Sequence, residues 1–104
     1  MLIAQGVFRI DPENREAFLD QSVEQMEISR GEKGCLEYAL SADPLEPDRV
    51  LLSERWETQE DLDVHFQDLM ARREAAAAAG GDPPLAPSSR EVTVFEVASS
   101  RSLG

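Results

Sequence analysis

The chain has 104 residues, which is enough for one hydrophobic core and too few for two. Lys and Arg number 10 against 21 Asp and Glu, so the net charge of -11 repels a nucleic-acid backbone or an anionic membrane surface. No stretch approaches the ~18 apolar residues of a membrane span. The one cysteine, Cys35, fits a small buried residue in a reducing compartment. We therefore expect a cytoplasmic protein with no nucleic-acid or membrane partner.

The first half of the chain predicts a strand followed by a helix. Apolar and polar residues alternate from Leu2 to Ile10, which is typical of a strand with one apolar face. Asp11 then supplies a helix N-cap and Pro12 suits the first helical position, so a helix is expected from there to Arg30. Its inward stripe is expected to consist of Ala17, Phe18, Leu19, Ser22, Val23 and Met26.

The second half predicts two strands, a helix and a last strand. Residues 35–41 and 50–57 favour an antiparallel pair joined by a proline-containing loop. Thr58 caps a helix that is expected to reach about Ala79. A proline-rich connector at 82–89 leads to a strand over 90–98 that carries apolar groups on both faces. We expect a single domain over residues 1–98, with 99–104 as a flexible C-terminal tail.

This order of elements is the ferredoxin-like split β-α-β pattern (βαββαβ) of the α+β class, an antiparallel sheet with two helices on one face. The uncovered face is expected to keep apolar residues in either register. In the last strand Phe95 and Val97 lie on one face and Val92 and Val94 on the other, and Leu36, Tyr38 and Leu40 are expected to lie together. A contiguous apolar face usually marks an interface. The pattern therefore predicts a homodimer that forms through the open face of the sheet.

Two side chains are the first candidates for chemistry. His65 is the only histidine, and histidine is the residue type suited to general-base catalysis near neutral pH. Its structural alternative is a place at the edge of the core, hydrogen-bonded to the backbone or to a carboxylate. Glu54 falls on an otherwise apolar strand face, where a carboxylate must be paired, protonated or open to a pocket. For Glu54 the alternative to catalysis is an ion pair with Arg9, Arg55 or an arginine of a second subunit.

Tyr38 is expected to be buried, with its hydroxyl bound either to a substrate oxygen or to a backbone carbonyl. Trp56 shares a strand face with Leu52 and is either a packing residue or an aromatic wall for a planar substrate. Phe66 is the next residue along the helix from His65, which is expected to point toward the cleft between helix and sheet. Trp56, Phe66 and Leu52 are thus the candidate substrate-binding residues.

Four acids near the start of the second helix are interpreted as solvated residues that favour the helix dipole, so no metal site is expected: Glu57, Glu60, Asp61 and Asp63.

Three segments together carry a family resemblance: Glu32–Tyr38 (EKGCLEY), Ser53–Glu57 (SERWE), and Leu62 with His65. They resemble the E-x-G-C-L-x-Y, E-x-W and H pattern of the antibiotic biosynthesis monooxygenase (ABM) family, whose members are small dimeric α+β barrel proteins. The resemblance extends from Leu2 to about Val97. The family that the chain resembles includes cofactor-free oxygenases of quinol-like polyketides, haem-degrading enzymes and an isomerase of a small signalling sugar.

Residues of this chain depart from the patterns of two of those branches. The haem-degrading members have an asparagine near the position of Gly6 and an iron-ligating histidine near that of Ala75. The isomerase-like members often have a second histidine where this chain has Met70. The resemblance implies a monooxygenase without a cofactor that acts on a small aromatic or quinol-like molecule and dioxygen, in a pocket between helices and sheet. In that role His65 is the base, helped by Tyr38 or Glu54. A non-catalytic dimeric small-molecule-binding protein and an isomerase or lyase of a small oxygenated metabolite are the alternatives.

Overall fold

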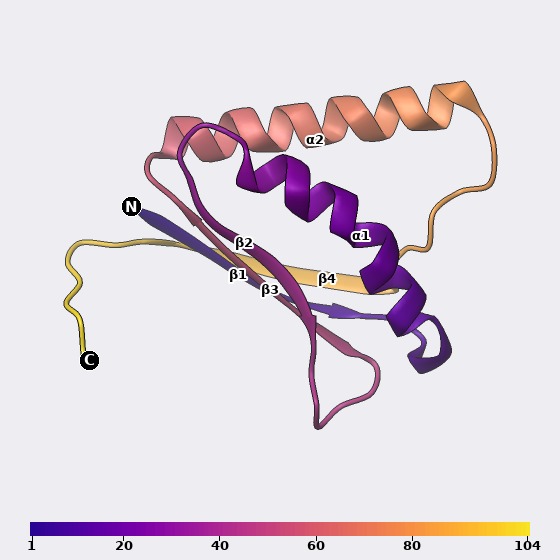
Figure 1. Cartoon of the computed structure of the whole chain (residues 1–104), viewed down its shortest axis with the longest axis horizontal. Coiled ribbons are helices and arrows are strands. Elements are labelled where there is room, and N and C mark those ends of the chain that lie inside the picture. Colours follow the sequence, from indigo (N-terminus) through magenta and orange to yellow (C-terminus); the bar gives the residue numbers. More distant parts are fainter.

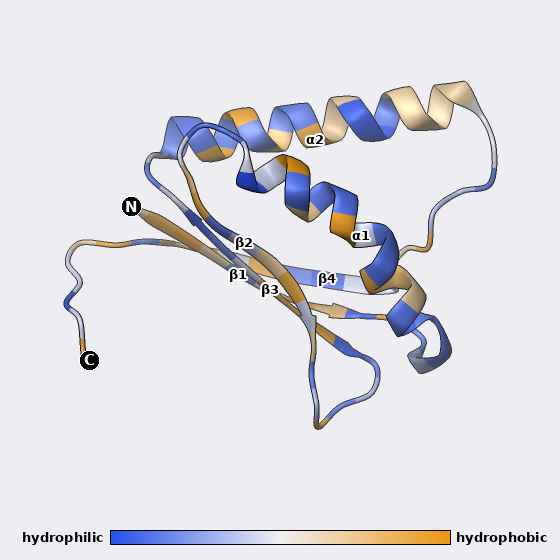
Figure 2. Cartoon of the chain, in the orientation of Figure 1, coloured by the Kyte–Doolittle hydropathy of each residue, from blue (hydrophilic) through white to orange (hydrophobic).

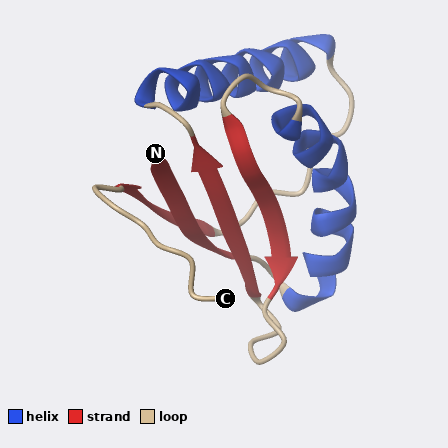
Figure 3. Cartoon of the chain, turned by 60° about the vertical axis from the view of Figure 1, so that its left-hand side comes forward, coloured by secondary structure: helices blue, strands red, loops and turns tan.

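The computed structural model of the protein describes residues 1–104 and has the predicted order of elements (Figure 1). The elements are β1 (Leu2–Arg9), a 3-10 turn (Pro12–Asn14), α1 (Arg15–Arg30), β2 (Cys35–Ala42), β3 (Arg49–Trp56), α2 (Gln59–Ala79) and β4 (Ser89–Glu96). The strands follow the order β2-β3-β1-β4, and all neighbours are antiparallel. Both helices lie on one side of the sheet (Figure 3). The ferredoxin-like α+β prediction is confirmed.

The first helix differs in detail from its prediction. Asp11 caps the chain as expected and accepts a hydrogen bond from the Glu13 amide at 2.9 Å. The turn that follows is a separate 3-10 turn, so the α-helix begins only at Arg15. The inward side of α1 carries Phe18, Ser22 and Ser29, whereas two residues of the expected stripe, Ala17 and Val23, are exposed to solvent.

The core forms between α1, α2 and the centre of the sheet. Alternate side chains of β3 turn toward the helices and are buried, namely Val50, Leu52, Glu54 and Trp56. Helix α1 packs on β2 and α2 on β3. Strand β4 is exposed along its whole length, and Val92 and Val94, which lie on the helix-facing side by register, are half-exposed. The helix-facing side of the sheet is thus covered at β2 and β3 and more open at β4.

The open side of the sheet is mixed rather than wholly apolar. By register its apolar residues are Ile3, Val7, Ala39, Leu51 and Phe95, and a polar row of Gln5, Ser53 and Thr93 crosses them. A β-bulge between Cys35 and Glu37 interrupts the alternation of β2. Tyr38 and Leu40 consequently lie on the helix-facing side, and Leu36 does not continue their row. The expectation that these three residues lie together on the open face is wrong.

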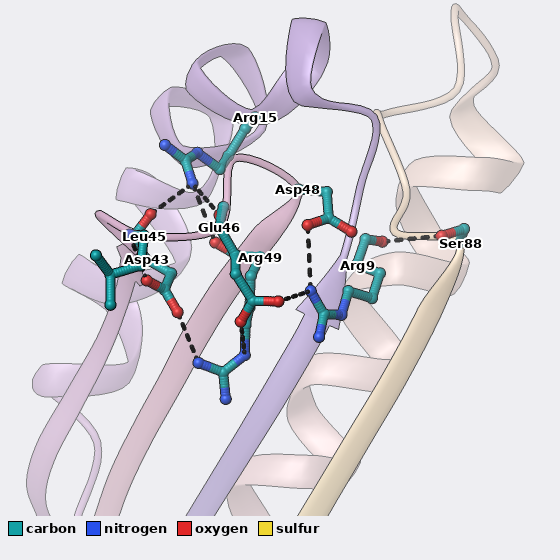
Figure 4. A network of polar contacts seen from close by, with 8 residues as sticks. All are labelled: Arg9, Arg15, Asp43, Leu45, Glu46, Asp48, Arg49 and Ser88. Atoms are coloured by element: carbon teal, nitrogen blue, oxygen red, sulfur yellow. Dashed lines mark hydrogen bonds and ion pairs between the residues drawn. The ribbon is translucent and has the colours of Figure 1, made fainter.

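The loop between β2 and β3 is held by arginines (Figure 4). Arg15 Nη1 donates hydrogen bonds to three backbone carbonyls, those of Asp43, Glu46 and Arg49, at 2.9, 2.9 and 3.3 Å. Arg49 donates to the Asp43 carboxylate at 2.7 Å. Arg9 pairs with Glu46 and with Asp48 at 3.2 and 3.1 Å. Side chains of the protein thus satisfy backbone carbonyls of this loop. Arg9 pairs with acids of the loop and not with Glu54.

Helix α2 is 21 residues long and changes character along its length. Its N-cap Thr58 accepts a hydrogen bond from the Asp61 amide at 3.1 Å, as the sequence predicts. Figure 2 shows polar and apolar bands over the first turns and the pale colour of the alanine run at the end. No helix of this chain combines the length and the apolar character that crossing a lipid bilayer requires.

At Gly34 the connection between α1 and β2 packs closely against α2. Its φ is +80°, and a Cβ at this position would overlap the side chain of Asp61. We expect Gly34→Ala to lower the free energy of unfolding by about 2–4 kcal/mol, measured as an earlier urea midpoint. Gly31→Ala is the matched control, because Gly31 has a φ of -87° and its nearest new contact is 3.5 Å. Equal midpoints for the two variants would contradict this prediction.

Candidate active site

His65 lies in the contact between α2 and the sheet. It belongs to a row spaced four residues apart, Asp61, His65 and Leu69, which are the buried residues of α2. Its side chain is only 3% exposed. The imidazole stacks on the Trp56 ring of β3, with centroids 4.6 Å apart and planes at 35°. The ring of Tyr38 from β2 is 5.3 Å away on a tilted plane. The fold thus surrounds the only histidine with the only tryptophan and the only tyrosine.

Both nitrogens of the imidazole lie beside carboxylates. Nδ1 is 2.7 Å from Glu32 Oε1, and Nε2 is 3.7 Å from Glu54 Oε1. Trp56 Nε1 donates a hydrogen bond to that same Glu54 oxygen at 3.0 Å. A carboxylate on Nδ1 fixes the orientation of the ring. The arrangement therefore holds one imidazole in a defined position beside two carboxylates.

Glu32 is a site residue that the sequence reasoning missed. It lies in the connection between α1 and β2, 33 positions from His65. No local pattern links two residues so far apart, and only the packing of α2 against this connection brings them together. Its place within the EKGCLEY segment is the one signal in the sequence that could have drawn attention to it.

Glu54 has no arginine partner in this chain, so the predicted ion pair with Arg9 or Arg55 is wrong. Arg55 points to the other face of the sheet and pairs with Glu37 at 2.9 Å, while Arg9 holds the loop after β2. Burial raises the pKa of the Glu54 carboxyl, although the Trp56 hydrogen bond and the charge of His65 act in the opposite direction. Glu54 binds a proton more readily than an exposed glutamate does.

Tyr38 is buried as predicted. Burial, and next the negative charge of Glu54, raise the pKa of its phenol to about 12, while Arg73 acts in the opposite direction. The hydroxyl is therefore protonated at neutral pH. It can donate a hydrogen bond to a ligand oxygen but does not act as a base.

The predicted substrate-binding residues are in different environments. Leu52 and Trp56 are buried together with Tyr38 in one apolar cluster. Phe66 is 57% exposed, because consecutive helical residues point about 100° apart and the His65 side faces the sheet. The structure thus assembles His65, Glu54, Tyr38, Trp56 and Leu52, whereas Phe66 lies outside this cluster.

Two pockets border the cluster. The first, of about 250 Å³, reaches His65 and is mostly acidic; it is lined by Glu32, Lys33, Glu60, Asp61, Val64, His65 and Asp68. The second, of about 340 Å³, borders Tyr38 along β2 and includes Cys35, whose thiol has a pKa raised by burial.

Asp61 was predicted to be solvated, but its side chain is buried. It is 7% exposed because it packs against Gly34.

Residues 1–77 match the family model described as "Antibiotic biosynthesis monooxygenase". The chain belongs to the antibiotic biosynthesis monooxygenase family. A Bacillus subtilis protein, YcnE, whose name proposes a monooxygenase activity, is 27% identical over 77 residues, which are 69% of this chain and 81% of that protein. An uncharacterised Synechocystis protein is 33% identical over 66 residues. That match covers 64% of this chain but only 45% of the Synechocystis protein.

Solved structures of ABM-like proteins have the same fold. A structure from Deinococcus radiodurans, named for the same family, superposes with a TM-score of 0.79 at 21% identity and covers 100% of this chain and 99% of its own. A heme-degrading protein from Mycobacterium tuberculosis, solved with two hemes in its active site, gives 0.68 at 16% identity, with 98% and 100% coverage. At these identities the likeness concerns the fold alone.

Tyr38 gives a direct test of the burial of this site, since it is the only tyrosine. We expect its absorbance at alkaline pH to titrate near pH 12 in the folded protein and near 10 in urea. The folded state holds the proton more tightly, so this group's contribution to stability is complete below about pH 10 and decreases as the pH rises toward 12. Glu54→Gln should lower the folded midpoint. A folded midpoint near 10 would mean that water reaches the hydroxyl.

Proposed function

We propose that this protein is a cofactor-independent monooxygenase of a small aromatic or quinol-like molecule, bound between the helices and the sheet. The observation that carries the proposal is the buried imidazole of His65, which lies between two carboxylates and two aromatic rings in a chain of the ABM family. A base in that setting suits the deprotonation of a phenol.

In the proposed reaction His65 removes a proton from the substrate, and Glu32 stabilises the imidazolium that forms. The substrate anion is electron-rich and reduces dioxygen directly. One oxygen atom enters the substrate carbon and the other leaves as water, so an anthrone-like CH₂ becomes a carbonyl. The two C–H bonds supply all the electrons, and no other reductant is needed. Tyr38 donates a hydrogen bond to the substrate oxygen, while Trp56 and Leu52 provide apolar contacts.

A non-catalytic binding protein is the second candidate, and one observation favours it. The ring of His65 is almost fully buried, and its nitrogens lie beside carboxylates of its own chain. A histidine held in this way also serves as a structural link between α2 and the sheet. In that case a small molecule would bind without turnover.

Oxygen uptake separates these functions. With a panel of anthrones, naphthols and hydroquinones we expect turnover by the wild type and a loss of about 100-fold or more in His65→Ala. His65→Gln keeps a polar contact toward Glu32 and should lose turnover while remaining folded. Leu69→Ala removes a buried side chain one turn further along α2 and should lower thermal stability but retain turnover.

Unchanged oxygen uptake in both His65 variants would remove the proposed base. Binding without uptake would favour the binding protein, and conversion of a substrate without oxygen would favour an isomerase or lyase.

We further propose that two copies of the chain pair through the open face of the sheet. The supporting features are the half-buried Val7 and Leu51, which are register partners on that face, together with Ile3 and Phe95 nearby. Face-to-face packing would cover these apolar groups, while Gln5 and its polar row would find partners in the second sheet.

Light scattering tests the assembly. We expect the wild type to have twice the mass of the 11.5 kDa chain and Leu51→Glu to shift it toward the monomer, because a charge would be buried at the interface. Val23→Glu is the control, since Val23 is a half-exposed apolar residue on α1, away from that face. A wild-type particle of 11.5 kDa, or equal dissociation by both variants, would exclude this interface.

A further inference from the structure

The connector between α2 and β4, residues 80–88, combines a glycine pair with a proline-rich middle; we call it the strap. Gly80 and Gly81 have φ values of +81° and +95°, and a Cβ on either would meet no atom within 4 Å. Three of the next six residues are proline, and each fixes its own backbone angle. In Figure 1 the strap leaves the far end of α2 and returns past α1 to β4. This composition suits a stiff segment that turns about a glycine hinge.

One glutamine of α1 holds the middle of the strap. The Gln21 side chain donates a hydrogen bond to the Leu85 carbonyl at 2.7 Å and accepts one from the Leu85 amide at 3.1 Å. No other hydrogen bond joins residues 81–87 to the rest of the domain. The end of the strap is held separately, since the Ser88 amide and hydroxyl donate to the Arg9 carbonyl at 2.8 and 3.2 Å. The strap can therefore detach from α1 while its end stays on β1.

The side chain of Leu85 covers one end of the hydrophobic core. It packs against the buried cluster of Ile10, Phe18 and Val50. Leu85 is itself only partly buried, so it forms the outer layer of this end of the core. Movement of the strap away from α1 would uncover the cluster and leave the pairing of the strands intact.

Phe8 connects this end of the core with the candidate site. It packs against the cluster beneath Leu85 and also against the cluster that contains Trp56. The acidic pocket offers a less favourable approach, because Val64 is the only hydrophobic residue among the seven that line it at His65. An uncharged aromatic molecule in that pocket would take carboxylates out of water, which is costly. The path beneath the strap is apolar along its whole length.

We propose that the strap is a gate through which a small uncharged aromatic molecule enters the protein, with Gln21 as its latch. When Gln21 releases Leu85, residues 80–87 turn about the two glycines and open a path past Phe8 to Trp56. Two hydrogen bonds and one partly buried leucine hold the closed form, so opening is local and the sheet stays folded. The proposal rests on the proposed function, because it assigns an entry route to the site between helices and sheet.

Hydrogen exchange of the Trp56 indole tests whether the strap opens toward the site. Trp56 is the only tryptophan, is fully buried and gives a single indole N–H signal in an NMR spectrum. We expect this proton to exchange about 10-fold faster in Gln21→Ala and in Leu85→Ala than in the wild type. The backbone amides of β3 report opening of the whole domain and should exchange at the wild-type rate.

Stopped-flow mixing with 1-naphthol tests whether the path admits an aromatic molecule. We expect the association rate, followed by quenching of the Trp56 fluorescence, to rise about 10-fold in Gln21→Ala and in Leu85→Ala. Gln59→Ala is the matched control. Gln59 is also an exposed glutamine, but its side chain bonds Asp63 in the first turns of α2, so this variant should behave like the wild type in both experiments.

Indole exchange at the same rate in the wild type and both strap variants would overturn the gate. Equal acceleration of the β3 amides would overturn it as well, because the whole domain would then be opening. Faster indole exchange with unchanged naphthol association would mean that the path admits water and not the ligand. Faster exchange and association in the variants without oxygen uptake would keep the gate and refute the monooxygenase. Oxygen uptake by the wild type with both rates unchanged in the variants would do the reverse.

Discussion

The contact between α2 and the sheet depends on a buried polar side chain. Two of the three buried residues in α2, Asp61 and His65, are ionisable, and only Leu69 is apolar. Glu32 at 2.7 Å compensates for the removal of the imidazole from water, and Trp56 covers its face. A purely apolar contact would hold the helix as well. The polar contact has a stricter geometry, because the helix fits only where the histidine meets its carboxylate.

The order and approximate limits of the elements were predictable because they depend on local patterns. Alternation in the first strand, the Asp11 and Thr58 caps and the proline-rich connector are all visible within a few residues. The bulge at Cys35 could not be predicted in this way. One extra residue reverses the faces of a strand but leaves no clear pattern in the sequence.

The site was predictable only in part. Histidine, glutamate, tyrosine and tryptophan were identified because each is chemically conspicuous on its element. The partners of these residues were not identified. Glu32, which contacts His65, lies 33 positions away in the chain, and Glu54 accepts a hydrogen bond from Trp56 rather than pairing with an arginine. Phe66 was predicted to bind the substrate beside His65, but neighbouring residues on a helix face different ways and Phe66 is exposed.

Gly6 marks a close contact between β1 and β4. A Cβ at Gly6 would come within 2.8 Å of Val92 Cγ2, so Val92 occupies the space above the first strand. A larger residue at this position would require Val92 to shift. Around Gly6 the helix-facing side is apolar in this chain, with Leu52 and Val92 as the register partners of this glycine.

The loop between β2 and β3 has a consequence for labelling this protein. Exposed hairpin tips usually accept inserted peptides or dyes, because little of their backbone is engaged. Here Arg15 reaches across from α1 and bonds three carbonyls of the loop, so an insertion would break contacts that also position the first helix. The exposed residues from Ser99 onward, which follow the last strand, are a better point for attaching a label.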